Sequence, residues 1–118
     1  MPAKPSKTHQ PRPVAAERRG YVRYKRTLDT FWQFLGLPPR DLTAGQVVDL
    51  SVSGVGLMLD RTFPEGTSLV LRLPTARSGW ASHLVRVKHC RPAAGGRYVV
   101  GCQFVRPLTP EQLIAHLE

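Results

Sequence analysis

The feature that most constrains the fold is a series of short apolar segments, each broken by proline or glycine. From Ser68 onward, Leu69, Leu71 and Leu73 fall on one face of an extended chain, and Pro74 ends the run. An apolar residue at every second position is typical of a β-strand that is buried on one face. Further segments of this kind are 27–35, 46–51, 55–59, 83–90 and 97–105. Short strands without βαβ units predict a small antiparallel barrel or sandwich and exclude a Rossmann-type nucleotide site.

The two ends of the chain differ from this strand-rich middle. Residues 1–17 contain four prolines among Lys, Ser, Thr and Gln, so we predict a flexible basic N-terminal arm. Near the other end, Thr109 suits a helix N-cap and Pro110 suits the first helical position. With 118 residues, the chain is long enough for one modest core. The predicted organisation is an arm over 1–17, a β-domain over 18–106 and a C-terminal helix over 107–118.

The charge of the chain is strongly basic and unevenly distributed. Lys and Arg total 17 against 8 Asp and Glu, and eight of the basic residues precede residue 27. Such an arm fits an acidic partner, namely nucleic acid, a membrane surface or a small phosphate ligand, and fits a solvated tail equally well. No apolar run approaches the ~18 residues of a membrane span, and the N-terminus lacks the apolar region of a secretory signal. We therefore expect a cytoplasmic chain without a membrane span.

Two polar motifs carry most of the functional information. Arg19-Gly-Tyr-Val-Arg23 supplies two guanidinium groups at i and i+4, and Asp49-Leu-Ser-Val-Ser-Gly54 supplies a carboxylate, a hydroxyl and a glycine. Planar, permanently charged guanidinium groups suit phosphates and the O6/N7 edge of guanine. A carboxylate suits the N–H donors on the other edge of guanine. Together the motifs predict a binding site for an anionic guanine nucleotide rather than a catalytic centre.

Strand alternation predicts how the second motif is presented. If Val48 and Leu50 face the core, Asp49 and Ser51 project outward together. Gly54 follows in a turn, where the missing Cβ permits a positive φ angle and lets a ligand approach the backbone closely. Arg19 and Arg23 precede the first strand and are expected to fold over this patch like a clasp.

The ordered pair of motifs, Arg-x-x-x-Arg followed by Asp-x-Ser-x-x-Gly, resembles the PilZ domain, a bacterial receptor for cyclic di-GMP. Arg19 and Arg23 complete the first motif, and Asp49, Ser51 and Gly54 complete the second. The stretch Val100-Gly-Cys-Gln-Phe is similar to the Gly-x-x-Phe ending of the last strands of the family. The resemblance covers about residues 17–106.

The resemblance implies an all-β fold, a small six-stranded antiparallel β-barrel with a short C-terminal helix. It implies that Arg19 and Arg23 grip guanine edges and phosphates of cyclic di-GMP, a ligand rather than a cofactor. Asp49 and Ser51 would hold the guanine, and Gly54 would keep the turn open. Arg18, directly before the first motif, is consistent with a stacked pair of ligand molecules, because guanidinium planes stack on bases. The ligand would close the arginine segment and signal to an effector protein that the sequence does not identify.

Two other classes of function remain open from the sequence. A small basic β-barrel can bind DNA or RNA through its N-terminal arm, with steep salt dependence and little preference for guanine. That alternative needs basic residues across the barrel face and aromatic residues free to stack, whereas the basic density here lies in the arm. A degenerate PilZ scaffold that binds only protein is the second alternative, and the two complete motifs weigh against it.

The two cysteines are predicted to be free thiols. Val87 and His89 are placed inward against the last strand, in a register where Val87 faces Val100. In that register Cys102 points into the core and Cys90 points away from it. Side chains on opposite faces cannot form a disulfide without distortion of the backbone.

Neither a metal site nor an enzyme is predicted. His83 and His89 share a face while Cys90 lies opposite, and no fourth ligand has a suitable spacing. His9 and His116 are expected to be exposed. No Ser/His/Asp or paired-carboxylate arrangement supports catalysis.

One remaining segment, residues 31–35, is apolar at both odd and even positions. We expect this strand to be covered on both sides rather than to form an exposed interaction patch.

Overall fold

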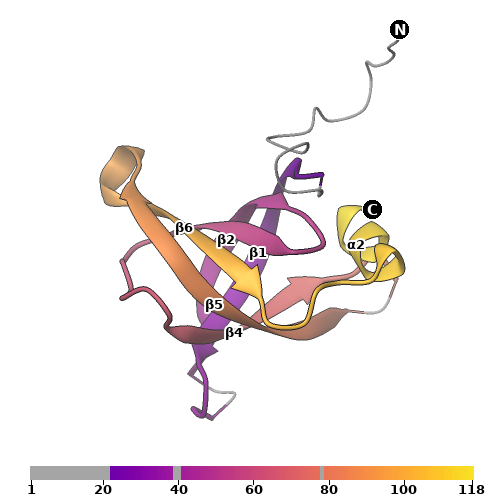
Figure 1. The fold of residues 1–118 in the computed structure, drawn as a ribbon, viewed down its shortest axis with the longest axis horizontal. Coiled ribbons are helices and arrows are strands. Elements are labelled where there is room, and N and C mark those ends of the chain that lie inside the picture. The colour runs from indigo at the N-terminus through magenta and orange to yellow at the C-terminus, as the bar shows by residue number, and fades with distance from the viewer. Residues whose placement is uncertain (1–21, 39–40, 78) are drawn as a thin grey trace, which may run out of the picture.

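The computed structural model describes residues 22–38, 41–77 and 79–118, which form a closed, six-stranded antiparallel barrel with a C-terminal helix (Figure 1). Around the barrel the strands follow the order β1-β2-β3-β6-β5-β4. The elements are β1 (Tyr24–Phe34), β2 (Thr43–Leu50), β3 (Gly54–Leu59), β4 (Ser68–Pro74), β5 (Trp80–Pro92), the 3-10 turn η2 (Ala94–Gly96), β6 (Tyr98–Phe104) and α2 (Pro110–Leu117). The fold class predicted from the strand pattern and the resemblance is therefore confirmed.

The barrel interior is the hydrophobic core. Leu69, Leu71 and Leu73 of β4 are completely buried, as their alternation predicts. Each large apolar side chain that is fully buried contributes about 1.5–3 kcal/mol relative to exposure. Further core residues from the other strands are Val47, Leu50, Val55, Leu57, Leu59, Val85, Val87, Val100, Cys102 and Phe104. Within the described residues the sheet closes on itself, so hydrogen-bonded strands surround this core.

The apolar segment 31–35 is covered on both faces along β1. Trp32 and Gln33 are neighbours in the strand and both are buried, although their side chains point to opposite faces. Trp32 packs edge-on against Phe63, with ring centroids 5.1 Å apart, and the Gln33 amide donates to the carbonyl of Leu37 at 2.6 Å. The exposed part of the segment is Leu35, where the strand has ended.

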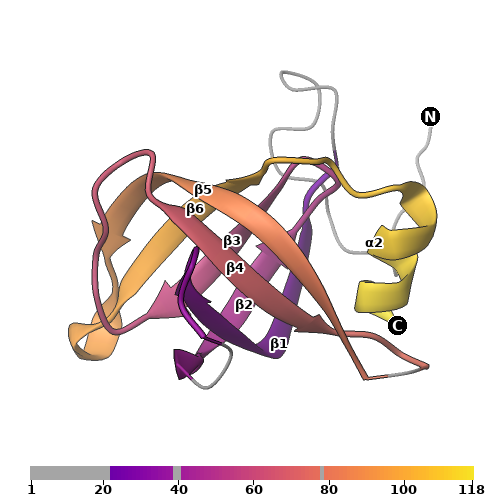
Figure 2. The same ribbon diagram turned by 90° about the horizontal axis from the view of Figure 1, so that it is seen from below.

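Helix α2 lies at the end of the barrel opposite the β5–β6 hairpin (Figure 2). Its start is a capping box: the hydroxyl of Thr109 accepts the N–H of Gln112 at 3.1 Å, and the Gln112 side chain accepts the N–H of Thr109 at 2.8 Å. Pro110 occupies the first helical position, as predicted. Within the described residues, no helix has both the length and the apolar character that crossing a membrane requires.

His116 fixes the inner face of α2, so the prediction that it is exposed is wrong. The side chain is only 3% exposed. Its Nδ1 lies 2.7 Å from the carbonyl oxygen of Pro74, and its Nε2 lies 3.0 Å from Nε2 of His83. His116 lies on the same helical face as the core-packed Leu113 and Leu117. Spacings of three and four residues place these side chains together against the barrel.

A β-bulge in β2 changes the alternation that the sequence predicted. The pairing with β3 shifts between Val47 and Asp49, which makes Val48 the extra residue. Val47 and Leu50 are consequently buried completely, and Val48 is only half-buried. The prediction that Val48 points into the core is wrong, because the bulge gives that place to Val47.

A second bulge lies in β5. Its pairing with β6 shifts between Val87 and His89, so Lys88 is the extra residue. Val87 faces Cys102 and not Val100, so the predicted register is wrong. Val87 is buried as expected, but His89 is exposed on the outer surface rather than directed inward. It therefore does not share a face with His83, whose ring packs against the core residue Phe104.

The bulge in β5 also reverses the expectation for Cys90. Cys90 packs half-buried against the core, with its thiol 3.6 Å from the carbonyl oxygen of Phe63. The prediction of two free thiols is confirmed, whereas the face assigned to Cys90 is wrong. Burial, with a smaller effect of the neighbouring Cys90, raises the pKa of the Cys102 thiol to about 12. Cys102 is therefore a neutral core residue at physiological pH.

Candidate functional site

The turn between β2 and β3 is organised by Ser51. Its hydroxyl oxygen accepts the backbone N–H of Gly54 at 3.1 Å and that of Ser53 at 3.3 Å. The backbone N–H of Ser51 donates to the carbonyl of Gly54 at 2.9 Å. The side chain is completely buried, so the prediction that Ser51 projects outward beside Asp49 is wrong. The chain leaves the strand after Leu50, and the hydroxyl then satisfies the backbone donors of the turn.

Asp49 does project from the outer surface of β2, and it meets an arginine of the first motif. Nη2 of Arg23 lies 2.6 Å from Oδ1 of Asp49, with side chains that are 17% and 23% exposed. This charge-assisted hydrogen bond joins the two motifs directly. Arg18 and Arg19, the other predicted arginines, lie outside the described residues.

Gly54 allows two strands of the barrel to approach each other closely. The glycines with positive φ do not include Gly54, which is buried at the start of β3. A Cβ at this position would lie 2.6 Å from the carbonyl oxygen of Cys102 in β6. The missing side chain therefore allows the close approach of β6, and the backbone does not use the positive φ that glycine permits.

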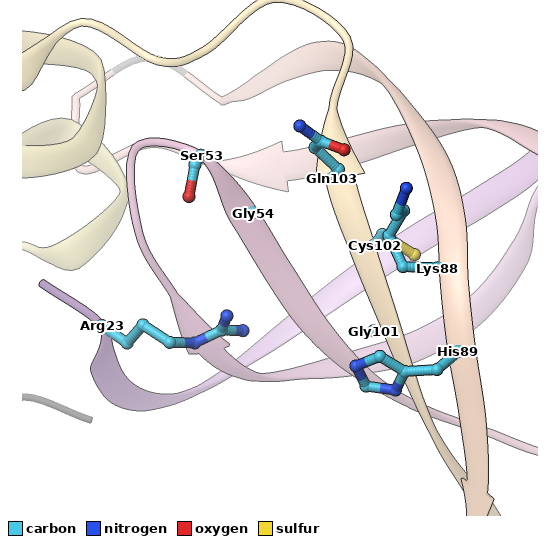
Figure 3. Close-up of a pocket in the computed structure, with 8 residues that line it drawn as sticks. All are labelled: Arg23, Ser53, Gly54, Lys88, His89, Gly101, Cys102 and Gln103. Atoms are coloured by element: carbon cyan, nitrogen blue, oxygen red, sulfur yellow. The ribbon is translucent and has the colours of Figure 1, made fainter. Parts of the chain in front are cut away.

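A groove lies next to this turn and the Arg23–Asp49 pair (Figure 3). Its volume is about 500 Å³. The lining residues are Arg23, Ser53, Gly54, Lys88, His89, Gly101, Cys102 and Gln103. They include two permanent cations and no acidic residue, so the groove suits an anion.

The sequence did not predict the three exposed polar side chains that β5 and β6 contribute to this groove: Lys88, His89 and Gln103. All three are exposed. A signal for the first two does exist in the sequence. The consecutive polar residues Lys88 and His89 interrupt the apolar alternation, although only the pairing of β5 with β6 identifies a bulge there.

The chemistry of the groove favours the binding of an anionic ligand. Its guanidinium and ammonium groups hold phosphates, and its Gln103 amide can pair with the edge of a base, as can the carboxylate of Asp49, which is bonded to Arg23 beside the groove. Among the described residues, no group of three or more His, Cys, Asp or Glu is arranged to hold a metal ion.

A comparison with models of protein families shows which family the chain belongs to. The PilZ domain model matches residues 17–118. The chain belongs to the PilZ domain family. Both motif segments lie within this match, including Arg18 and Arg19. No curated protein matches the chain at a significant level.

Three solved structures share the fold at low sequence identity. The inhibitor of motility MotI/DgrA of Bacillus subtilis superposes with a TM-score of 0.64 at 18% identity, over 84% of this chain and 48% of that one. The PilZ domain of YcgR from Escherichia coli, solved with c-di-GMP, gives 0.62 at 18% identity, over 85% and 88%. MrkH, described as a c-di-GMP-dependent transcription regulatory factor, gives 0.53 at 20% identity, over 80% and 46%. The chain thus spans about half the length of MotI and MrkH, and most of the YcgR domain.

Proposed function

We propose that this PilZ domain is a receptor for cyclic di-GMP that transmits the signal to a protein partner. The observation that carries the proposal is the 2.6 Å contact between Arg23 and Asp49. It brings the arginine motif and the aspartate motif to the edge of one cationic groove. Membership in the PilZ family and the c-di-GMP in the related YcgR domain support the same ligand.

The ligand fits the donors and acceptors of the site. Cyclic di-GMP carries two phosphates and two guanines. Arg23 offers a planar fork for a phosphate or for the O6/N7 edge of guanine, and Asp49 accepts from the N–H groups of the opposite edge. Arg18 and Arg19 are proposed to extend these contacts, and Arg18 is proposed to stack within a pair of ligand molecules.

Ser51 and Gly54 act in this proposal through the shape of the site. The hydroxyl of Ser51 is buried and engaged by the backbone of the turn. Gly54 allows β3 and β6 to approach each other closely. Both residues hold Asp49 and the floor of the groove in place, and the arginines and Asp49 contact the ligand.

The signal is proposed to arise from the residues that precede β1. Because β1 begins at Tyr24, Arg23 is the last motif residue before the barrel. Ligand contacts by Arg18, Arg19 and Arg23 would fix this segment against the groove and create a surface for an effector protein.

Isothermal titration calorimetry with cyclic di-GMP tests the proposal. Arg23→Ala and Asp49→Ala should each weaken binding by about 1.5–3 kcal/mol, the usual value of a hydrogen bond to a charged group. Arg97→Ala, an exposed arginine beyond η2, is the matched control and should bind like the wild type. Absence of binding to the wild type, or wild-type affinity in both site variants, would contradict the proposal.

Two further measurements test the number of ligands per chain and the nucleic-acid alternative. A stoichiometry of two ligands per chain, reduced to one by Arg18→Ala, is the result expected for a stacked pair. A single-stranded DNA of random sequence should not compete with cyclic di-GMP, whereas strong salt-dependent competition would favour the nucleic-acid alternative.

A further inference from the structure

Four residues on four adjacent strands form one row across the outer surface of the barrel. Asp49 of β2 pairs with Gly56 of β3, Gly56 pairs with Gly101 of β6, and Gly101 pairs with His89 of β5. The two central positions have no side chain. Asp49 and His89 therefore stand on either side of a floor made of two glycines.

Both side chains extend over this floor. A Cβ built on Gly56 would lie 2.9 Å from Oδ2 of Asp49, and a Cβ built on Gly101 would collide with the imidazole of His89. The carboxylate and the imidazole thus occupy the space directly above the glycines. Figure 3 shows the His89 ring beside Gly101, with the Arg23 guanidinium entering from the opposite side of the groove.

Asp49 and His89 each take their position from a β-bulge. Asp49 directly follows the bulge at Val48, and His89 directly follows the bulge at Lys88. A bulge inserts one residue and redirects the side chains around it. In β5 this leaves two consecutive residues, Lys88 and His89, exposed on the outer surface, where a regular strand would expose only one.

These two residues add complementary chemistry to the groove. The His89 imidazole provides a flat ring of the kind on which bases stack, and Lys88 provides a compact positive charge for a phosphate. Both line the groove that Arg23 lines from the other side.

We propose that the β5 bulge is a second contact wall of the nucleotide site. The His89 ring packs against a guanine whose edge is held by Arg23 and Asp49, and Lys88 pairs with a phosphate of the same ligand. The inference rests on the proposed function and adds two ligand-contacting residues that lie outside both sequence motifs.

Calorimetric titration of cyclic di-GMP into matched variants tests this wall. His89→Ala should raise the Kd on the order of tenfold, as for the loss of a stacked base, while His89→Phe should retain most of the affinity. Lys88→Ala should weaken binding and reduce its dependence on salt, and Lys88→Arg should restore both. Arg91→Ala removes an exposed cation from the same strand outside the groove and should have no effect.

A measurement on the wild-type chain is independent of variant folding. The Cε1 proton of His89, assigned by its loss in His89→Phe, should shift upfield on addition of cyclic di-GMP because of the ring current of the stacked base. An unshifted proton together with wild-type affinity in His89→Ala and Lys88→Ala would overturn the second wall. If Arg23→Ala still loses binding in that case, the proposed function stands. Absence of binding to the wild type would overturn both.

Discussion

Arg23 and Asp49 are separated by 26 positions in the chain, yet their side chains form an ion pair with Nη2 and Oδ1 2.6 Å apart. The pair is formed because β1 and β2 are antiparallel neighbours in the barrel. Lys25 lies opposite Asp49 in that register, so Arg23, which precedes the first strand, can reach back to the carboxylate. The contact therefore follows from the pairing of two strands rather than from either motif alone.

The first prediction concerns the strength of this pair. A double-mutant cycle with Arg23→Ala and Asp49→Ala should give a coupling free energy of about 1 kcal/mol, because both groups are largely but not fully buried. The coupling should decrease at high salt. Urea unfolding of the wild type, both single variants and the double variant measures it. A coupling indistinguishable from zero at low salt would contradict the prediction.

The second prediction separates a structural role of Ser51 from a ligand contact. Ser51→Ala should lower the free energy of unfolding by about 1–3 kcal/mol, because the buried N–H of Gly54 loses its acceptor. Ser82→Ala, an exposed serine on β5, is the control and should have little effect. Chemical unfolding measures both variants, and equal stability of the two would show that the hydroxyl does not support the turn.

The third prediction contrasts two glycines of β3. Gly54→Ala should destabilise the barrel by about 1–3 kcal/mol, because the new Cβ meets the Cys102 carbonyl, a backbone atom that cannot move aside. Gly56→Ala should cost less stability, because the atoms nearest to its new Cβ belong to the side-chain carboxylate of Asp49.

Titration with cyclic di-GMP adds the effect of Gly56→Ala on ligand affinity. Gly56→Ala displaces the Asp49 carboxylate, so it should weaken cyclic di-GMP binding more than it weakens the fold. Unfolding curves and calorimetry on the same samples provide both quantities. The reverse order of the two stability losses would contradict the prediction.

The fourth prediction is a loss of stability in mild acid. Burial, and to a smaller extent the charge of His116, lower the pKa of His83 from 6.5 to about 4. The carbonyl of Pro74 can only accept, so Nδ1 of His116 donates to it. Nε2 of His116 lies 3.0 Å from Nε2 of His83, which is itself partly buried. The native state thus favours neutral His83.

The sign of the pH effect follows from this preference. The unfolded chain takes up a proton near pH 6.5 while native His83 does not, so this stabilisation is complete above pH 6.5 and is lost between pH 6.5 and 4. Thermal unfolding of the wild type and His83→Gln across that range measures it. The difference in pH dependence between the two isolates His83 from the carboxylates, and parallel curves would refute the assignment.

The strands and the helix were predictable because their signals are local. The alternation of Leu69, Leu71 and Leu73 has a period of two whatever the partner strand is, and Thr109 and Pro110 specify a helix start through their own backbone preferences. The two motifs were recognisable for the same reason, since residue type and spacing are properties of the chain.

The bulges were not predictable from alternation alone, and they account for the errors at Val48 and His89. One extra residue at Val48 moved the buried position to Val47, and one extra residue at Lys88 turned His89 outward. A strand does not reveal its own bulges, because a bulge is a mismatch between two strands. The burial of His116 has a similar origin, because it depends on where α2 docks.

The sequence by itself determined the family, the strand-rich fold and the identity of the polar groups available to a ligand. The tertiary structure decided which of those groups share a surface. It paired Arg23 with Asp49, assigned Ser51 to the turn and brought Lys88 and His89 to the groove. The physical reason is that residue chemistry and period are encoded locally, whereas register, bulges and close backbone approach depend on hydrogen bonds between strands that are distant in the chain.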